Sequence, residues 1–181
     1  MIPVFDGHND LLLRLHSAPD QREAIWFGQE GRGQLDLPRM KAGGFAGGFF
    51  AIYVPSPSHS HADLAALDMA MNHPPFAVPL PAPVPVEKAQ AVALSMAGHL
   101  MALERTGTLS ICRTVADIRA AMAAGRIAAI LHMEGAEAID EGLDALHVWH
   151  GAGLRSLGPV WSRPTAFGHG VPFQFPGLPD T

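Results

Sequence analysis

Four short apolar runs, separated by helical segments, determine what this 181-residue chain can fold into. The runs predict strands, and they cover residues 2–6, 47–54, 127–133 and 154–160. The segments between them predict helices, at residues 11–15, 37–41, 87–105, 114–125 and 143–150. Strands that alternate with helices form parallel βαβ units, and a parallel sheet buries both of its faces. The fold class is therefore α/β.

Two architectures contain a parallel sheet of this kind, and the length of the chain bears on the choice. A doubly wound sheet can be small, whereas a complete (β/α)8 barrel typically needs about 250 residues. A barrel of 181 residues is therefore incomplete. We expect a single domain over residues 1–181, with a Pro-rich surface excursion at 55–85 that holds one short helix near 62–72. Residues 18–33 predict a loop, and residues 162–181 an irregular end.

The charge balance and the cysteine usage exclude several kinds of partner. Seventeen acidic residues against twelve Lys and Arg give a net charge of −5 without a basic cluster, so neither nucleic acid nor an anionic membrane fits. The expected partner is a small molecule. The single cysteine, Cys112, forms no internal disulfide, the N-terminus has no signal-peptide pattern, and no apolar run is long enough to span a membrane. These features predict a cytoplasmic protein.

The triplet His8-Asn9-Asp10 is the first candidate metal site, in a chain with ten histidines. In extended backbone, residues two apart project from the same face, so His8 and Asp10 can meet one cation. Nitrogen and oxygen ligands of this type suit zinc, which in catalytic sites keeps a position open for water. The alternative is structural: Asp10 caps the following helix and His8 forms a hydrogen bond beside it.

Glu134 directly follows the predicted strand at residues 127–133. Sites in parallel α/β architectures collect at the carboxyl ends of the strands, so Glu134 is a candidate metal ligand whose two oxygens can bridge two ions. The alternatives are a charge at a helix N-terminus or an ion pair with Arg126 or Arg155.

Most other histidines have simpler interpretations. We expect His132 to be a hydrogen-bonded histidine in the protein interior. His59 and His61 predict a solvated loop, although their spacing occurs in metal-dependent hydrolases. His147 and His150 are expected to pack on a helix face.

Aromatic and cationic residues follow the last predicted strand and are candidates to line a substrate pocket: Trp161, Arg163, Phe167 and His169. A packed loop is the alternative.

Four segments, in this order, resemble the membrane dipeptidase (renal dipeptidase) family of zinc peptidases, especially its bacterial members. They are Asp6-Gly7-His8-Asn9-Asp10, the run from Asp36 to Phe50, the run from Met133 to Ile139, and Leu154-Arg155-Ser156-Leu157. The resemblance covers nearly the whole chain. It implies a (β/α)8 TIM-type barrel whose binuclear zinc centre cleaves dipeptides. In this pattern His8 and Asp10 hold the first zinc, and Glu134 bridges both zinc ions as the catalytic carboxylate.

The sequence departs from this family pattern in two places. Trp161 stands where several animal members have a substrate-facing His, and His169 is the candidate substitute in substrate binding. The sequence reaches Thr181 before the segment that, in the family, supplies two His ligands of the second zinc, a catalytic Asp and a substrate-binding Arg. We therefore expect the isolated chain to be the N-terminal half of the barrel, with weak metal binding and little or no activity.

An incomplete barrel exposes an unpaired strand and an apolar face, so we expect self-association or pairing with a C-terminal half. Two functional alternatives remain open. One is a hydrolase of N-acyl amino acids or lactams on the same scaffold, and the other is a degenerate, non-catalytic metal-binding fragment.

Overall fold

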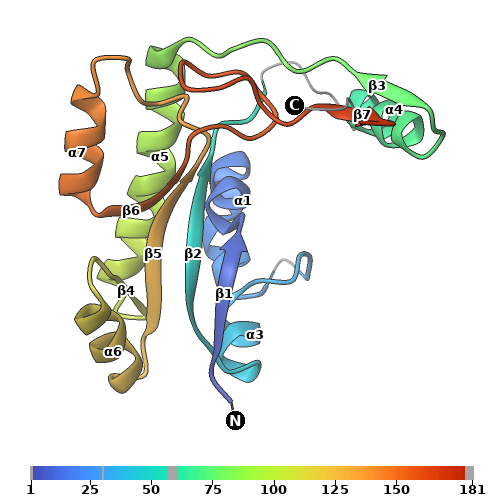
Figure 1. Cartoon of the computed structure of the whole chain (residues 1–181). Helices are drawn as coiled ribbons and strands as arrows, with labels where there is room; N and C mark the ends of the chain where they lie inside the picture. The colour runs from blue at the N-terminus through green and yellow to red at the C-terminus, as the bar shows by residue number, and fades with distance from the viewer. Residues whose placement is uncertain (1, 30, 57–60, 178–181) are drawn as a thin grey trace.

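A computed structural model describes residues 2–29, 31–56 and 61–177, and its central feature is a five-stranded sheet. Every pair of neighbouring strands in this sheet is parallel (Figure 1). The order is β1-β2-β5, with β4 and β6 both pairing with the far edge of β5. The prediction of an α/β fold with a parallel sheet is therefore confirmed. The strands are β1 Val4–Asn9, β2 Phe45–Tyr53, β4 Leu109–Ile111, β5 Ile127–Glu134 and β6 Leu154–Gly158.

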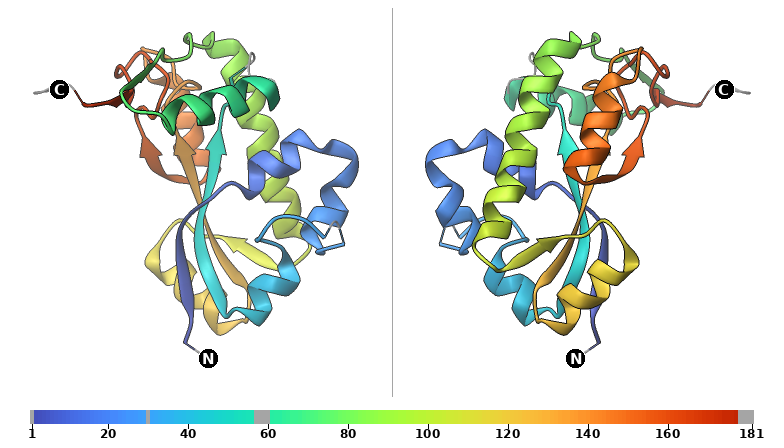
Figure 2. Two further views of the ribbon diagram at one scale, coloured as in Figure 1. Left: turned by 90° about the vertical axis from the view of Figure 1, so that its right-hand side faces the viewer. Right: turned by 90° about the vertical axis from the view of Figure 1, so that its left-hand side faces the viewer.

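Helices follow most of these strands and bury one face of the sheet. They are α1 Leu11–Ser17, α2 Arg22–Trp26, α3 Leu37–Ala42, α5 Val86–Arg105, α6 Val115–Ala123 and α7 Asp144–Ala152. In both views of Figure 2, the long helix α5 runs beside the sheet. Leu12 of α1 and Leu100 of α5 share one core cluster with Phe50 of β2 and Leu131 of β5. None of the helices in the described ranges is long and apolar enough to cross a membrane.

The opposite face of the sheet is less covered, and the burial along β5 shows this difference. Leu131 and Met133 point to the helices and are fully buried, whereas His132 and Glu134 alternate with them and are only partly buried. Residues that alternate along a strand lie on opposite faces. His132 and Glu134 therefore lie on the less covered face, near the carboxyl end of β5.

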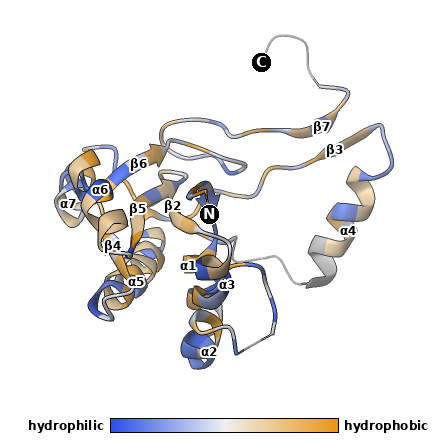
Figure 3. Cartoon of the chain, turned by 90° about the horizontal axis from the view of Figure 1, so that it is seen from below, coloured by the Kyte–Doolittle hydropathy of each residue, from blue (hydrophilic) through white to orange (hydrophobic). Residues whose placement is uncertain are grey.

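A small extension lies beyond this end of the sheet. Helix α4, His61–Met71, is followed by β3, Phe76–Val78, which pairs antiparallel with β7, Phe173–Phe175. Figure 3 shows these three elements on one side, away from α5, α6 and α7. The helix expected near residues 62–72 is present. The expectation of an irregular end after residue 161 was wrong at β7, because a strand of three residues carries little periodicity of its own.

Two further elements differ from the sequence prediction. The segment expected as a loop contains a 3-10 turn, Pro19–Gln21, and helix α2, in which Ile25 and Trp26 are buried. Strand β4 was not predicted at all. Both are short, so packing against the rest of the protein rather than local propensity stabilises them.

Candidate metal centre

Strands β1 and β5 bring the three predicted metal ligands to one place. His8 lies near the end of β1, Asp10 immediately precedes α1, and Glu134 is the last residue of β5. Strand β2 lies between β1 and β5. Because all three strands are parallel, their carboxyl ends meet at one edge of the sheet, which is where sites in this architecture form.

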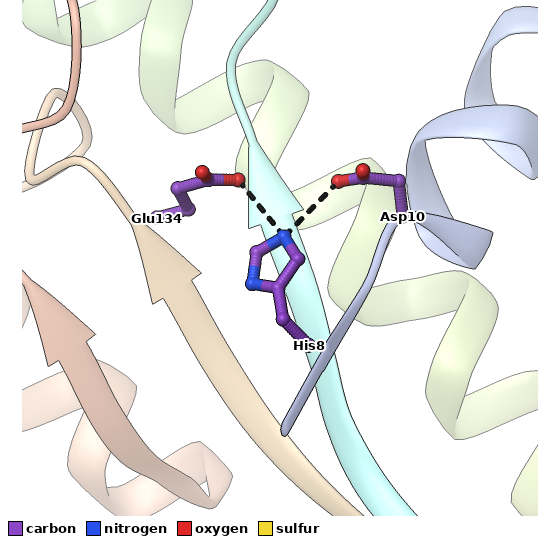
Figure 4. A group of neighbouring side chains, drawn as sticks. All are labelled: His8, Asp10 and Glu134. Atoms are coloured by element: carbon purple, nitrogen blue, oxygen red, sulfur yellow. Dashed lines mark ion pairs between the residues drawn. The ribbon is translucent and has the colours of Figure 1, made fainter. Parts of the chain in front are cut away.

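The imidazole of His8 is the centre of the cluster (Figure 4). Its Nε2 atom lies 3.5 Å from Oδ1 of Asp10 and 3.3 Å from Oε2 of Glu134. One donor atom from each residue lies within 4.8 Å of the other two. Two carboxylate oxygens and one imidazole nitrogen that lie this close together could all bind one metal ion. The donor set of one nitrogen and two oxygens fits a zinc site.

The backbone around His8 is held in place by neighbouring side chains. The carboxylate of Asp6 accepts hydrogen bonds from the backbone N–H of His8, at 3.4 Å, and from Nδ2 of Asn9, at 2.9 Å. The first N–H of α1, that of Leu11, donates to Oδ1 of Asn9 at 3.4 Å. The side chain of Asp10 forms no capping hydrogen bond. Asp10 thus occupies the N-cap position, as the alternative expected, but its carboxylate faces His8 and does not cap the helix.

Glu134 and His132 share the less covered face of β5 but have different surroundings. Burial raises the pKa of Glu134, His8 opposes this rise, and the nearby charges of Asp10 and Glu137 add to it. Burial and the neighbouring His8 lower the pKa of His132, whose Nδ1 lies 2.9 Å from Oγ of Ser156. The rings of His132 and His8 are 5.6 Å apart in an edge-to-face arrangement. The predicted hydrogen bond of His132 is therefore confirmed, but the side chain is only partly buried, and it packs against a candidate ligand.

The two ion pairs considered for Glu134 are not formed. Arg155 donates to the backbone carbonyls of Arg113, His150 and Leu154. Arg126 precedes the first residue of β5 and is therefore at the opposite end of that strand from Glu134.

The remaining predicted histidines do not join the cluster where they are described. His147 and His150 are exposed on α7, so the expected packing was wrong: Trp149 between them provides the buried side chain of this helix. His59 lies outside the described residues, and of His61 the structure describes only the backbone of α4.

Trp161, expected at the substrate, lies beside Tyr53, the last residue of β2. Their rings are 5.9 Å apart and nearly perpendicular, and Trp161 makes a similar contact with Phe173 of β7. Tyr53 is the register partner of Glu134, so Trp161 is separated from the cluster by one side chain. Burial raises the pKa of Tyr53, and its hydroxyl is neutral at physiological pH. His169 is exposed, and its role in substrate binding stays a prediction.

Arg163, a candidate for the substrate pocket, is instead buried in a packed loop and forms an ion pair that the sequence analysis did not predict. Nη1 of Arg163 donates to Oε1 of Glu137 and to the carbonyl of Val54, each at 2.9 Å, and Nη2 donates to Oγ of Ser56 at 2.6 Å. The side chains of Arg163 and Glu137 are 2% and 5% exposed. Burial raises the pKa of Glu137, and the charge and hydrogen bond of Arg163 offset part of this rise. One guanidinium thus connects the segments that follow β2, β5 and β6.

The chain is similar to several known proteins. The family described as Membrane dipeptidase (Peptidase family M19) matches residues 1–174. A metallo peptidase from Rhodobacter sphaeroides, solved with a phosphinate mimic of the dipeptide L-Ala-D-Ala, is 62% identical, with a TM-score of 0.91 over 99% of this chain and 51% of that one.

Two curated relatives have lower identity. An uncharacterized protein in the PQQ-III 3' region of Acinetobacter calcoaceticus is 39% identical over 99% of this chain and 55% of its own length. Dipeptidase ataJ of Aspergillus terreus is 27% identical over 85% of this chain and 34% of its own length. The chain therefore spans about half, or less, of the length of these relatives.

Proposed function

This chain belongs to the membrane dipeptidase family, and from that premise we propose that the protein containing it is a zinc-dependent dipeptidase. His8, Asp10 and Glu134 are its proposed metal ligands. The observation that carries the proposal is the convergence of these three side chains, from two parallel strands and the start of α1, within 4.8 Å of one another. The incomplete TIM-type barrel of the chain is the scaffold that presents them.

Each side chain has a distinct proposed role. Zinc bound at this site would lower the pKa of a bound water and polarise the peptide carbonyl. His8 and Asp10 would hold the ion from β1 and the start of α1. Glu134 directs one oxygen toward His8, and its carboxylate would be the third ligand of the ion. His132 holds the ring of His8 from the side, and its own hydrogen bond to Ser156 fixes its orientation.

We propose a dipeptide as the substrate. The proposal follows from the scaffold and from the Rhodobacter sphaeroides relative, which was solved with a phosphinate mimic of L-Ala-D-Ala. A hydrolase of N-acyl amino acids or lactams would use the same zinc chemistry but would not require a free amino group. Trp161 is proposed to contact the substrate because it lies one side chain from the cluster, and His169 because it follows on the same loop.

A direct assay separates the two activities. The protein containing this chain is loaded with zinc and incubated with L-Ala-D-Ala or with N-acetyl-D-alanine, and free D-alanine is measured. We expect D-alanine from the dipeptide and at least about tenfold less from the N-acyl compound. Preferred hydrolysis of the N-acyl compound, or no hydrolysis of the dipeptide by zinc-loaded protein, would overturn the proposed function.

The 181 residues alone are expected to bind zinc weakly and to hydrolyse little. Within the described ranges, a single group of His, Asp and Glu side chains meets the distances of a metal site. The single-domain organisation over residues 1–181, the surface excursion at 55–85, and the pairing of the open sheet with a second copy or a C-terminal half stay predictions.

A further inference from the structure

A hollow of about 530 Å³ lies next to the candidate metal centre. Its walls come from α1, from the end of β2, from the α4–β3 extension, and from the loop and strand that follow β6. Figure 1 shows this extension beyond the end of the sheet at which β2 and β5 finish. The volume is within the range of small-molecule binding pockets.

Two of the residues that line the hollow lie close to residues of the candidate metal centre. Tyr53 lines it and is paired in register with Glu134, on the adjacent strand. Neighbouring strands lie about 4.8 Å apart, so a molecule at Glu134 is within reach of the ring of Tyr53. Leu13, which also lines the hollow, lies on α1 one turn after Asp10. A substrate seated at the cluster can therefore place a side chain in this hollow.

The wall of the hollow selects for apolar groups. Its lining residues include three aromatic side chains, Tyr53, Trp161 and Phe173, together with aliphatic side chains and several prolines. The polar side chains of the lining are hydroxyls, and none of the lining residues is charged. A charged substrate side chain would lose hydration there without a partner, whereas an aromatic or large aliphatic one would gain apolar contact.

We propose that this hollow receives the large apolar side chain of a dipeptide whose peptide bond lies at His8, Asp10 and Glu134. The inference rests on the proposed function and narrows it: the substrate class becomes dipeptides with one aromatic or large aliphatic residue. Trp161 and Phe173 are the specificity-determining residues, since their edge-to-face contact forms one wall.

Trp161 also provides the means of testing this proposal. The other two tryptophans, Trp26 and Trp149, are 1% and 5% exposed, whereas Trp161 is 43% exposed, so its emission reports on the hollow. The 181-residue chain, kept in chelator so that hydrolysis does not compete, is titrated with Ala-Ala, Ala-Phe, Phe-Ala and Ala-Glu. We expect one of the two Phe dipeptides to shift the emission at a concentration at least about tenfold lower than Ala-Ala does, and Ala-Glu to bind no better than Ala-Ala.

Two variants form a matched pair on the same strand. Phe173→Ala removes a wall of the hollow, whereas Phe175→Ala changes a 57% exposed residue outside its lining. Because Phe173 contacts the reporter, calorimetry measures binding to the variants. We expect Phe173→Ala to remove the preference for the Phe dipeptide, and Phe175→Ala to retain it.

Equal binding of the four dipeptides by the unaltered chain would overturn the inference, even if Phe173→Ala fails to fold. This outcome differs from failure of the proposed function, which is measured by hydrolysis in the presence of zinc. A preference for the Phe dipeptide without hydrolysis would support the hollow as a binding site and count against the dipeptidase. Hydrolysis of dipeptides with zinc, but without a binding preference for the Phe dipeptide, would support the dipeptidase and count against the hollow as a side-chain site.

Discussion

Glu134→Gln is expected to reduce the zinc affinity of the 181-residue chain at least about 100-fold. Gln keeps the shape of the side chain but removes its negative charge, so only one carboxylate faces the Nε2 atom of His8. Zinc ligands are preferentially anionic oxygen or sulfur atoms and imidazole nitrogens, and a neutral amide is a poor substitute. Competition with a chromophoric chelator measures the affinity directly, without dependence on activity.

The matched control for this variant is Glu87→Gln, which makes the same chemical change on an exposed glutamate in the first turn of α5. We expect it to leave the zinc affinity unchanged, and both variants to melt as the unaltered chain does. Unchanged zinc affinity in Glu134→Gln would show that the ion binds elsewhere and would remove Glu134 from the proposed centre.

Arg163→Met is expected to lower the free energy of unfolding by about 3–5 kcal/mol. The change leaves the carboxylate of Glu137 buried without a counter-charge, and it removes the donors to the Val54 carbonyl and to Ser56. Breaking a buried pair by removal of one partner is costly because the remaining charge stays desolvated. Urea denaturation followed by circular dichroism gives the free energy.

Two controls separate this effect from a general effect of losing an arginine. Arg119→Met changes an exposed arginine of α6, and we expect a change within about 0.5 kcal/mol. The double variant Arg163→Met with Glu137→Gln leaves neither charge buried alone, so it should lose less stability than the sum of the two single variants. A loss below about 1 kcal/mol for Arg163→Met would mean that the pair does not hold the three segments together.

Much of the candidate metal centre could be predicted from the sequence because its determinants are local. The spacing of His8 and Asp10 places both on one side of an extended chain, and Glu134 follows a strand that is recognisable from its apolar residues alone. Parallel topology then brings the two strand ends together. What the sequence left open was the role of Asp10, because a helix cap and a metal ligand require the same residue type at the same place.

The contacts that the sequence analysis missed join residues that are far apart along the chain. Glu137 and Arg163 are 26 positions apart, and Ser56 is 107 positions from Arg163. No local period or motif connects such positions, and their pairing follows only from the folded arrangement of the strand ends. The β3–β7 pair and helix α2 were missed for a related reason: each is short, and packing rather than propensity stabilises it.

The central claim is that His8, Asp10 and Glu134 bind one zinc ion, and anomalous diffraction tests it most directly. Crystals of the 181-residue chain grown with zinc would be measured on both sides of the zinc absorption edge. We predict one anomalous peak about 2.0–2.2 Å from Nε2 of His8 and from a carboxylate oxygen of both Asp10 and Glu134. A zinc peak on other side chains, with these three left unliganded, would contradict the account.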